Sequence, residues 1–180
     1  MQEIDRIDNF DETGNSVDAW KQKAEELSFC AEGLQSHADS ESSKVYDLQK
    51  QIILQMSSFW VKQMLRGFTL ECLLKALWLK NGNSLCDQGR YNGLDGIKNH
   101  RIHEMAPKVG FQTNDTEKRV LRILGAFATS GGRYPVFTKY DSLSKDFGSG
   151  NPKFILEWNL QELEPAYFEL RRKLVNEIEE

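Results

Sequence analysis

Cysteine is scarce in this chain, and the few cysteines do not cluster. Cys30, Cys72 and Cys86 are odd in number and lie far apart among 180 residues. A secreted domain stapled by disulfides needs an even and denser set, so this pattern excludes a disulfide framework and favours a reducing compartment. We therefore expect a cytoplasmic protein. Cys30 and Cys72 occupy apolar helical positions and are expected in the core.

Long apolar runs free of charge are also lacking. The most apolar stretch, Phe59–Leu79 (FWVKQMLRGFTLECLLKALWL), is interrupted by Lys62, Arg66, Glu71 and Lys75. A helix that spans a bilayer needs about 20 residues with few or no charges, so no membrane span is expected. The opening residues MQEIDRIDNF are polar and acidic, which is not the pattern of a signal peptide.

Motifs for metal, phosphate or nucleophilic chemistry are missing. His100 and His103 are three residues apart with Cys86 upstream, but no CxxC or HExxH completes a zinc site. The glycines at 82, 89, 93 and 96 match neither a Walker A motif nor GxGxxG, and no GxSxG is present. We therefore expect no metal and no cofactor.

Period-two alternation, the pattern of strands, is almost absent, whereas apolar residues recur at helical spacing. The chain predicts an all-α fold, an up-and-down bundle of about five helices. Residues 1–16 are polar and are expected to form a flexible N-terminus before a single domain over residues 17–180. The expected helices cover residues 17–37, 44–80, 100–109 and 114–130, and a last one has apolar residues from Leu160 to Leu174, with Pro165 as a candidate first residue.

Local signals mark the ends of these helices. Ser16 is a candidate N-cap, and Asn114 with Glu117 forms a capping-box pattern. Gly82 suits the left-handed residue that ends a helix, and Gly67 is a candidate kink in the long second helix. Loops or irregular segments are expected at residues 38–43 (ADSESS), 81–99 and 131–157.

Apolar residues cover nearly every face of the segment from Phe68 to Leu79. A helix that is apolar all round must be covered on all sides, so this one is expected to run through the middle of the protein. Its charged exceptions, Glu71 and Lys75, stand four residues apart with the acid first, the favourable orientation for a pair on one face. The pair is either a structural ion pair beside the core or part of a ligand-binding cleft.

Three further residues are candidates for a site with this pair. His103, in HRIHEMAPKVG, is either a cap or core-edge residue, or a group for acid–base chemistry or phosphate contact. Arg133 and Tyr134, in GGRYP, either form a rigid turn that binds helix-terminal carbonyls or bring a guanidinium into a cleft. Sequence alone leaves both interpretations open.

The net charge of −4 hides an uneven distribution. Residues 1–50 carry 12 acids and 5 bases, residues 51–150 carry 8 and 14, and residues 151–180 carry 7 and 4. The basic middle could face the phosphates of a nucleotide or RNA, or it could pair with the acidic ends of the same chain or of a second copy. The bases are spread out rather than clustered, which favours pairing.

The order of these features resembles that of HEPN domains, small helical bundles common in prokaryotes. The likeness covers about residues 45–135 and rests on GFTLECLLKALWLKNG with Glu71 and Lys75, HEMAPKVGF with His103, and GGRYP with Arg133 and Tyr134. It implies a bundle of about four or five helices that pairs into dimers. Many members of the family are metal-independent RNases in toxin–antitoxin, phage-defence or RNA-processing systems, and others bind nucleotides or partner with nucleotidyltransferase-like proteins.

The Arg-x(4–6)-His signature of the family's RNases is missing here. The nearest arginines before His103 are Arg101, Arg90 and Arg66, none of them at that spacing. The resemblance therefore implies a non-catalytic module that forms a homodimer and binds a nucleotide, RNA or a partner protein such as an antitoxin.

In this interpretation the ligand-binding residues are Glu71, Lys75, His103, Arg133 and Tyr134. One alternative is an atypical metal-independent RNase, in which His103 acts as acid–base and Arg133 stabilises phosphate charge. A second alternative is a structural adaptor whose charges serve only the fold.

Overall fold

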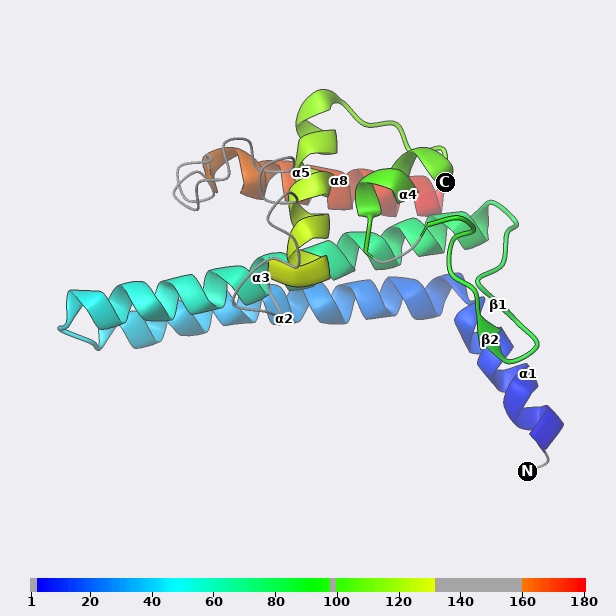
Figure 1. Cartoon of the computed structure of the whole chain (residues 1–180), viewed down its shortest axis with the longest axis horizontal. Coiled ribbons are helices and arrows are strands. Elements are labelled where there is room, and N and C mark those ends of the chain that lie inside the picture. The colour runs from blue at the N-terminus through cyan, green and yellow to red at the C-terminus, as the bar shows by residue number, and fades with distance from the viewer. Residues whose placement is uncertain (1–2, 98–99, 132–159) are drawn as a thin grey trace.

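The computed structural model describes residues 3–97, 100–131 and 160–180, and in these ranges the chain is an all-α helical bundle with one short β-hairpin (Figure 1). This confirms the fold class predicted from the sequence. The longest helices are α2, α3 and α8. The elements in chain order are α1 (Glu3–Gly14), α2 (Val17–Ser43), α3 (Leu48–Lys80), β1 (Cys86–Asp87), β2 (Arg90–Tyr91), α4 (Ile102–Lys108), α5 (Asp115–Ala126), the π-helix η1 (Phe127–Gly131) and α8 (Leu160–Glu179).

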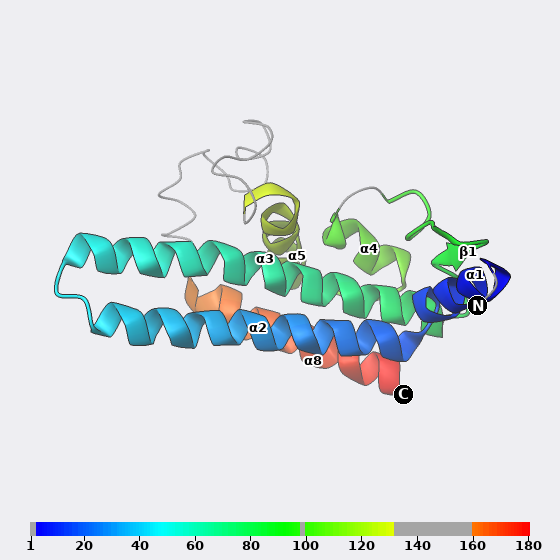
Figure 2. The same cartoon turned by 90° about the horizontal axis from the view of Figure 1, so that it is seen from below.

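Helices α2 and α3 lie side by side as a long antiparallel pair (Figures 1 and 2). Ser16 caps α2 as predicted, because its hydroxyl accepts a hydrogen bond from the backbone N–H of Ala19 at 3.2 Å. Asp47 caps α3 in the same way. The end of the pair that carries the turn extends beyond the other helices, and we call residues 35–58, which include this end, the arm.

Helix α2 is longer than predicted, because residues 38–43 continue the helix and do not form a loop. Ala38 is buried, so this segment has a packed side. Across the arm, the amide of Gln55 on α3 donates to the carboxylate of Asp39 at 3.0 Å and to the hydroxyl of Ser42 at 2.9 Å. These contacts with α3 outweigh the weak helix propensity of serine and aspartate.

Helix α3 runs through the middle of the bundle, as predicted, and contacts α2, α4, α5, η1 and α8. Every residue from Thr69 to Leu77 is buried. The helix is continuous through the candidate kink at Gly67. Gly67 instead permits a close crossing, since a Cβ at this position would lie 2.5 Å from the carbonyl oxygen of Leu124 in α5.

Most of the segment expected to be a flexible N-terminus forms helix α1. Asn15 anchors the end of this helix to the hairpin: its Oδ1 accepts from the N–H groups of Leu85 at 2.7 Å and Cys86 at 2.9 Å. The amide of Asn15 also donates to the carbonyl of Cys86, and Asp11 accepts from the N–H of Gly89. Such long-range bonds leave no trace in the local sequence.

The segment predicted as a loop after α3 contains the β-hairpin, in which Cys86 lies opposite Tyr91. Gly82 has a φ of +81°, which confirms the left-handed residue predicted at the end of α3. Leu85 and Leu94 are buried. The segment therefore closes over one end of the core.

The capping box of α5 is confirmed, because Asn114 and Glu117 each accept a hydrogen bond from the other's backbone N–H at 2.9 Å. Helix α8, in contrast, begins at Leu160, so Pro165 lies inside it and not at its first position. A proline so near an N-terminus removes few helical hydrogen bonds. Burial of Leu163 and the ion pair of Glu164 hold the turn before it.

The three cysteines are free thiols with different surroundings. Cys72 is buried, as expected, and burial raises its pKa to about 12. Cys30 is exposed, contrary to the expectation, because α2 buries only a narrow face that includes Ser28 and Ala31. Within the described ranges, no helix combines the length and the apolar character needed to cross a membrane.

Candidate functional site

Glu71 and Lys75 form the ion pair predicted from their spacing, and His100 completes it. Oε1 of Glu71 lies 2.6 Å from Nζ of Lys75, and Oε2 lies 2.7 Å from Nδ1 of His100. Because a carboxylate can only accept, Nδ1 of His100 carries the proton in this contact. We call these three residues the Glu71 cluster.

Two aromatic rings cover the cation of this cluster. The ammonium of Lys75 lies 4.6 Å from the ring centroid of Trp20 and 5.3 Å from that of Tyr91. These distances are within the range of cation–π attraction. Lys75 therefore connects α3 to the start of α2 and to the β-hairpin, while His100 connects α3 to the segment before α4.

Burial and pairing act in opposite directions on the pKa values of the cluster. Burial alone would raise the pKa of Glu71, but the hydrogen bond from His100 and the charge of Lys75 outweigh it and lower this pKa. Burial alone would lower the pKa of Lys75, but the Glu71 carboxylate raises it. Both groups are therefore held in their charged forms, which suits a structural ion pair.

Of the other predicted site residues, only His103 is among those that the structure describes. His103 lies in the first turn of α4, with Nε2 3.8 Å from the carboxylate of Glu104. Arg133 and Tyr134 lie outside the described residues. The histidine that contacts Glu71 is His100. The sequence predicted it as the first residue of a helix over residues 100–109, but α4 begins at Ile102, so His100 lies before the helix and helical spacing gave no guide to its partner.

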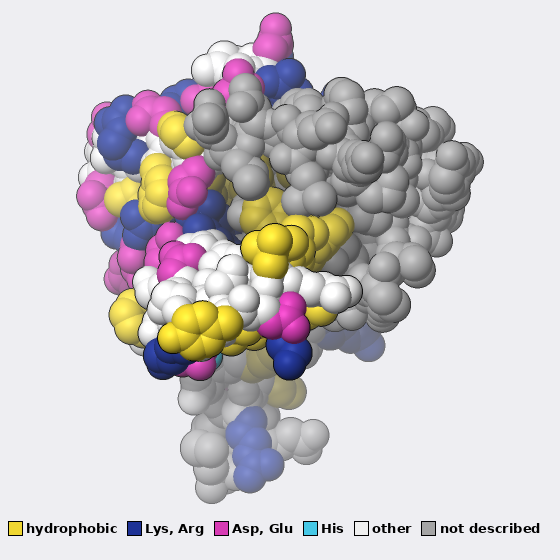
Figure 3. Space-filling view, turned by 90° about the vertical axis from the view of Figure 1, so that its left-hand side faces the viewer, with side chains coloured by type: hydrophobic (Ala, Val, Ile, Leu, Met, Phe, Trp, Pro, Cys, Tyr) yellow, Lys and Arg dark blue, Asp and Glu magenta, His cyan; other side chains and the backbone are white. Residues whose placement is uncertain are grey.

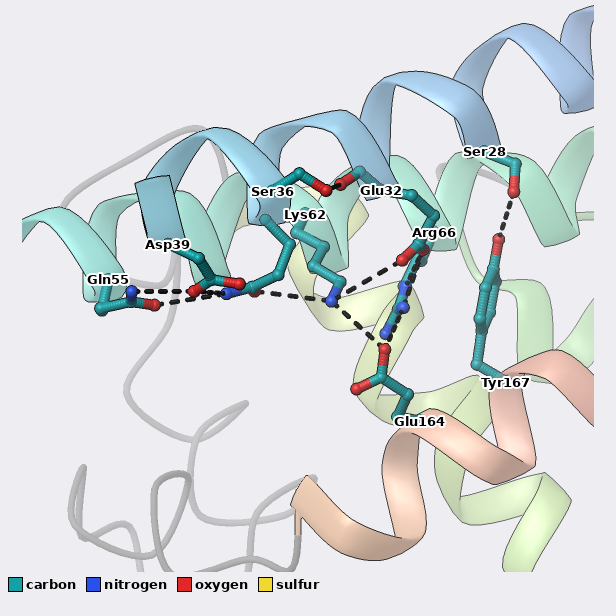
Figure 4. A network of polar contacts seen from close by, with 10 residues as sticks. Ser28, Glu32, Ser36, Asp39, Gln55, Lys62, Arg66, Glu164 and Tyr167 are labelled. Carbon is teal, nitrogen blue, oxygen red and sulfur yellow. Dashed lines mark hydrogen bonds and ion pairs between the residues drawn. The ribbon is translucent and has the colours of Figure 1, made fainter. Parts of the chain in front are cut away.

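A second and larger group of charges lies between α2, α3 and α8 (Figure 4). The guanidinium of Arg66, only 1% exposed, donates to Glu32 from Nε at 3.0 Å and from Nη2 at 2.7 Å, and to Glu164 from Nη2 at 2.7 Å. Lys62, one turn earlier on α3, lies 3.3 Å from the same oxygen of Glu164. We call Glu32, Lys62, Arg66 and Glu164 the Arg66 cluster.

The ring of Tyr167 supports Arg66 from the side of α8. The guanidinium carbon lies 4.6 Å from the centroid of this ring, and the Tyr167 hydroxyl is 3.2 Å from the hydroxyl of Ser28 (Figure 4). Burial raises the pKa of Tyr167, so this hydroxyl stays protonated. The arrangement fixes Arg66 between two carboxylates and an aromatic face.

A cavity of about 530 Å³ opens beside the Arg66 cluster. All four charged residues line it, together with the apolar side chains of Met56, Phe59 and Leu163. Its size and its mixture of apolar walls with a few polar groups are typical of small-molecule sites. Sequence reasoning missed it, because its walls come from three helices.

The Arg66 cluster bears on the uneven charge of the chain. Bases of the middle segment, Lys62 and Arg66, pair with Glu32 near one end and Glu164 near the other. Arg119 likewise pairs with Glu162. For these bases, the pairing favoured from the sequence is confirmed within one chain.

The arm presents a third feature, a group of exposed apolar side chains. Tyr46 is fully exposed, and Leu48, Ile52 and Ile53 are 69%, 54% and 57% exposed. Figure 3 looks onto the end of the arm, where hydrophobic side chains lie among a few charged ones. We call these four residues the arm surface.

Neither a metal centre nor a relative assigns a function to these features. Among the residues that the structure describes, no three His, Cys, Asp or Glu side chains form a group that could hold a metal ion. Comparison of the chain with protein-family models, with curated proteins and with solved structures found no match.

Proposed function

We propose that this chain is a non-catalytic helical module of the HEPN type that acts by binding protein, in the first place a second copy of itself. The helical fold and the Glu71–Lys75 pair on a central helix support the resemblance. The observation that carries the proposal is the arm surface, formed by Tyr46, Leu48, Ile52 and Ile53. Several exposed apolar side chains near the end of a projecting element are typical of a protein–protein contact.

The charge of the arm favours a protein partner over a nucleic acid. Residues 35–58 carry three acids, Asp39, Glu41 and Asp47, and two bases, Lys44 and Lys50. Lys44 already pairs with Glu41 at 2.7 Å. Binding to RNA requires uncompensated bases along the phosphates, and this surface has no such excess.

The same balance favours a second copy as the occupant. Two arms that carry almost no net charge can approach without repulsion, and each offers the other an equivalent apolar surface. Each arm is an antiparallel helix pair, so two arms together make a four-helix arrangement around one apolar seam. A nucleotidyltransferase-like protein or an antitoxin is then the candidate second partner, in a toxin–antitoxin or phage-defence context.

A ligand site at Glu71 and Lys75 receives less support. Both side chains are buried, and each charge is matched inside the cluster, so a nucleotide or RNA would have to displace His100 or the rings of Trp20 and Tyr91. The structural-adaptor interpretation of these charges fits this packing. It is compatible with protein binding at the arm.

Sedimentation velocity over a range of concentrations tests the proposal. We expect wild type to be a dimer and the double variant Leu48→Lys/Ile52→Lys to be a monomer, since four charges would enter the apolar seam. Ile7→Lys, an exposed apolar position on α1 at the opposite end of the molecule, is the matched control and should leave the dimer intact. A wild type that is monomeric at high concentration, or a double variant that still dimerises, contradicts the proposal.

RNA cleavage in EDTA tests the alternative of an atypical RNase. We expect no cleavage by wild type, His103→Ala or Arg133→Ala. Cleavage by wild type that both substitutions abolish would replace the binding module with an enzyme.

A further inference from the structure

The Arg66 cluster leaves one buried cation with weak contacts. Lys62 is 4% exposed, yet its Nζ lies 3.3 Å from Glu164, 3.5 Å from Gln35 and 3.9 Å from Glu32. Hydrogen bonds from an ammonium to a carboxylate are normally about 2.7–2.9 Å long. The neighbouring Arg66 takes the short contacts, so Lys62 retains capacity to bind a further acceptor.

Gln63, which also lines the cavity, carries a buried acceptor that lacks a donor. Oε1 of Gln63 is buried and receives no hydrogen bond from the residues that the structure describes. Only one oxygen of Glu164 contacts the described cations, and Figure 4 shows the other pointing away from Arg66. A buried amide oxygen without a donor is costly, so a ligand that supplies N–H groups would be stabilised here.

The charge of the cavity limits the class of ligand. Two carboxylates and two cations line it, so its net charge is zero and a ligand with a net charge would leave one charge uncompensated. A molecule with one anion and one ammonium satisfies both Lys62 and the acceptors of Glu164 and Gln63. The apolar side chains of Met56, Phe59 and Leu163 remain for a hydrocarbon group.

We propose that the cavity between α2, α3 and α8 binds a small zwitterion of the α-amino-acid class with an apolar side chain. Its carboxylate contacts Lys62, its ammonium group donates to Glu164 and, once the amide turns toward the ligand, to Gln63, and its side chain packs on Phe59. A volume of about 530 Å³ accommodates such a molecule. Part of the cavity wall, including Met56, belongs to the arm, but calorimetry measures ligand binding and sedimentation measures dimerisation, so failure of one proposal is distinguishable from failure of the other.

Isothermal titration calorimetry with L-methionine and L-leucine tests the proposal. We expect saturable binding, with the methyl esters and the N-acetyl derivatives at least about tenfold weaker, because each lacks one of the two charges. Lys62→Met should weaken binding by about tenfold or more, since it removes the cation for the carboxylate. Lys21→Met is the matched control: Lys21 pairs with Glu179 between α2 and α8 but does not line the cavity.

A second variant separates binding from folding. Gln63→Met keeps the size of the side chain and removes the buried oxygen that lacks a donor, so it should fold at least as well as wild type and still bind the amino acids more weakly. No heat of binding with either amino acid in wild type overturns the proposal. Equal binding of the esters, or equal binding of acetate alone, also overturns it and indicates an apolar or a simple anion site.

Discussion

Nδ1 of His100 lies 2.7 Å from one oxygen of Glu71, while the other oxygen of the same carboxylate lies 2.6 Å from Nζ of Lys75. One buried carboxylate thus holds the segment before α4 against the central helix and keeps Lys75 next to two aromatic rings. Removing it would leave a buried ammonium without a counter-ion. The cluster therefore stabilises the contact between these segments, and this stabilisation depends on the protonation of Glu71 and Lys75.

The stability of the protein should depend on pH through the titration of Glu71 and Lys75. A lowered pKa of Glu71 adds stability that is present above its ordinary value of 4.5 and is lost as the pH falls through the folded-state value. A raised pKa of Lys75 adds stability that is present below its ordinary value of 10.5 and is lost as the pH rises through the folded-state value.

Urea unfolding of wild type and Glu71→Gln checks this from neutral pH into the acid range. We expect the variant to be less stable at neutral pH and the two curves to converge below pH 4.5. Glu169→Gln, which removes the partner of Arg172 in an exposed pair, is the control and should change little. A difference between wild type and Glu71→Gln that does not vary with pH would contradict the prediction.

Shortening a buried side chain of the central helix should lower the stability of the protein strongly. Leu73→Ala or Leu77→Ala should lower the free energy of unfolding by about 2–5 kcal/mol, since both side chains are buried and leave a cavity. Leu48→Ala in dilute solution is the control, because this side chain is 69% exposed and its loss should change stability by about 0.5 kcal/mol or less. Similar effects at buried and exposed positions would contradict the packing of α3.

Two glycines on neighbouring helices should respond to alanine with opposite signs. A Cβ at Gly67 would lie 2.5 Å from the carbonyl oxygen of Leu124, so Gly67→Ala should destabilise by about 1–3 kcal/mol. A Cβ at Gly33 meets nothing within 4 Å, so Gly33→Ala should stabilise α2 by about 0.5–1 kcal/mol. Thermal unfolding of the two variants measures both changes in stability. Stabilisation by Gly67→Ala would contradict the close crossing of α3 and α5.

The Arg66 cluster should tolerate loss of the Arg66 guanidinium better than loss of its two carboxylates. In Glu32→Gln/Glu164→Gln, the buried guanidinium keeps no counter-ion, and we expect a loss of about 3–5 kcal/mol. Arg66→Met leaves two carboxylates that are 39% and 49% exposed and can turn to water, so its loss should be smaller. Chemical denaturation of both variants measures the two losses of stability. A larger loss in Arg66→Met than in the double variant would contradict the burial of Arg66.

What the sequence predicted correctly was local. The caps at Ser16 and Asn114 and the end of α3 at Gly82 follow from short patterns, and the Glu71–Lys75 pair follows from one turn of helix. The central position of α3 also follows, because an apolar surface on every face admits few arrangements.

What the sequence could not predict depends on contacts between distant segments. Asn15 orders α1 by bonding to Leu85 and Cys86, about 70 residues away. His100 meets Glu71 because of a loop path, and the cavity at Arg66 needs three helices to be in place. Sequence periodicity does not predict such contacts between distant segments. Arg133 and Tyr134 lie outside the residues that the structure describes.

Helix α3 carries both charge clusters, with Arg66 and Lys75 nine positions apart in the sequence. Leucines alone would allow this helix to slide by one turn and still bury an apolar face. Such a slip would separate Arg66 from Glu32 and Glu164, and Lys75 from Trp20 and Tyr91, at the same time. The two clusters therefore fix the register of α3. One alignment of the helix satisfies both sets of contacts, and every other alignment breaks both.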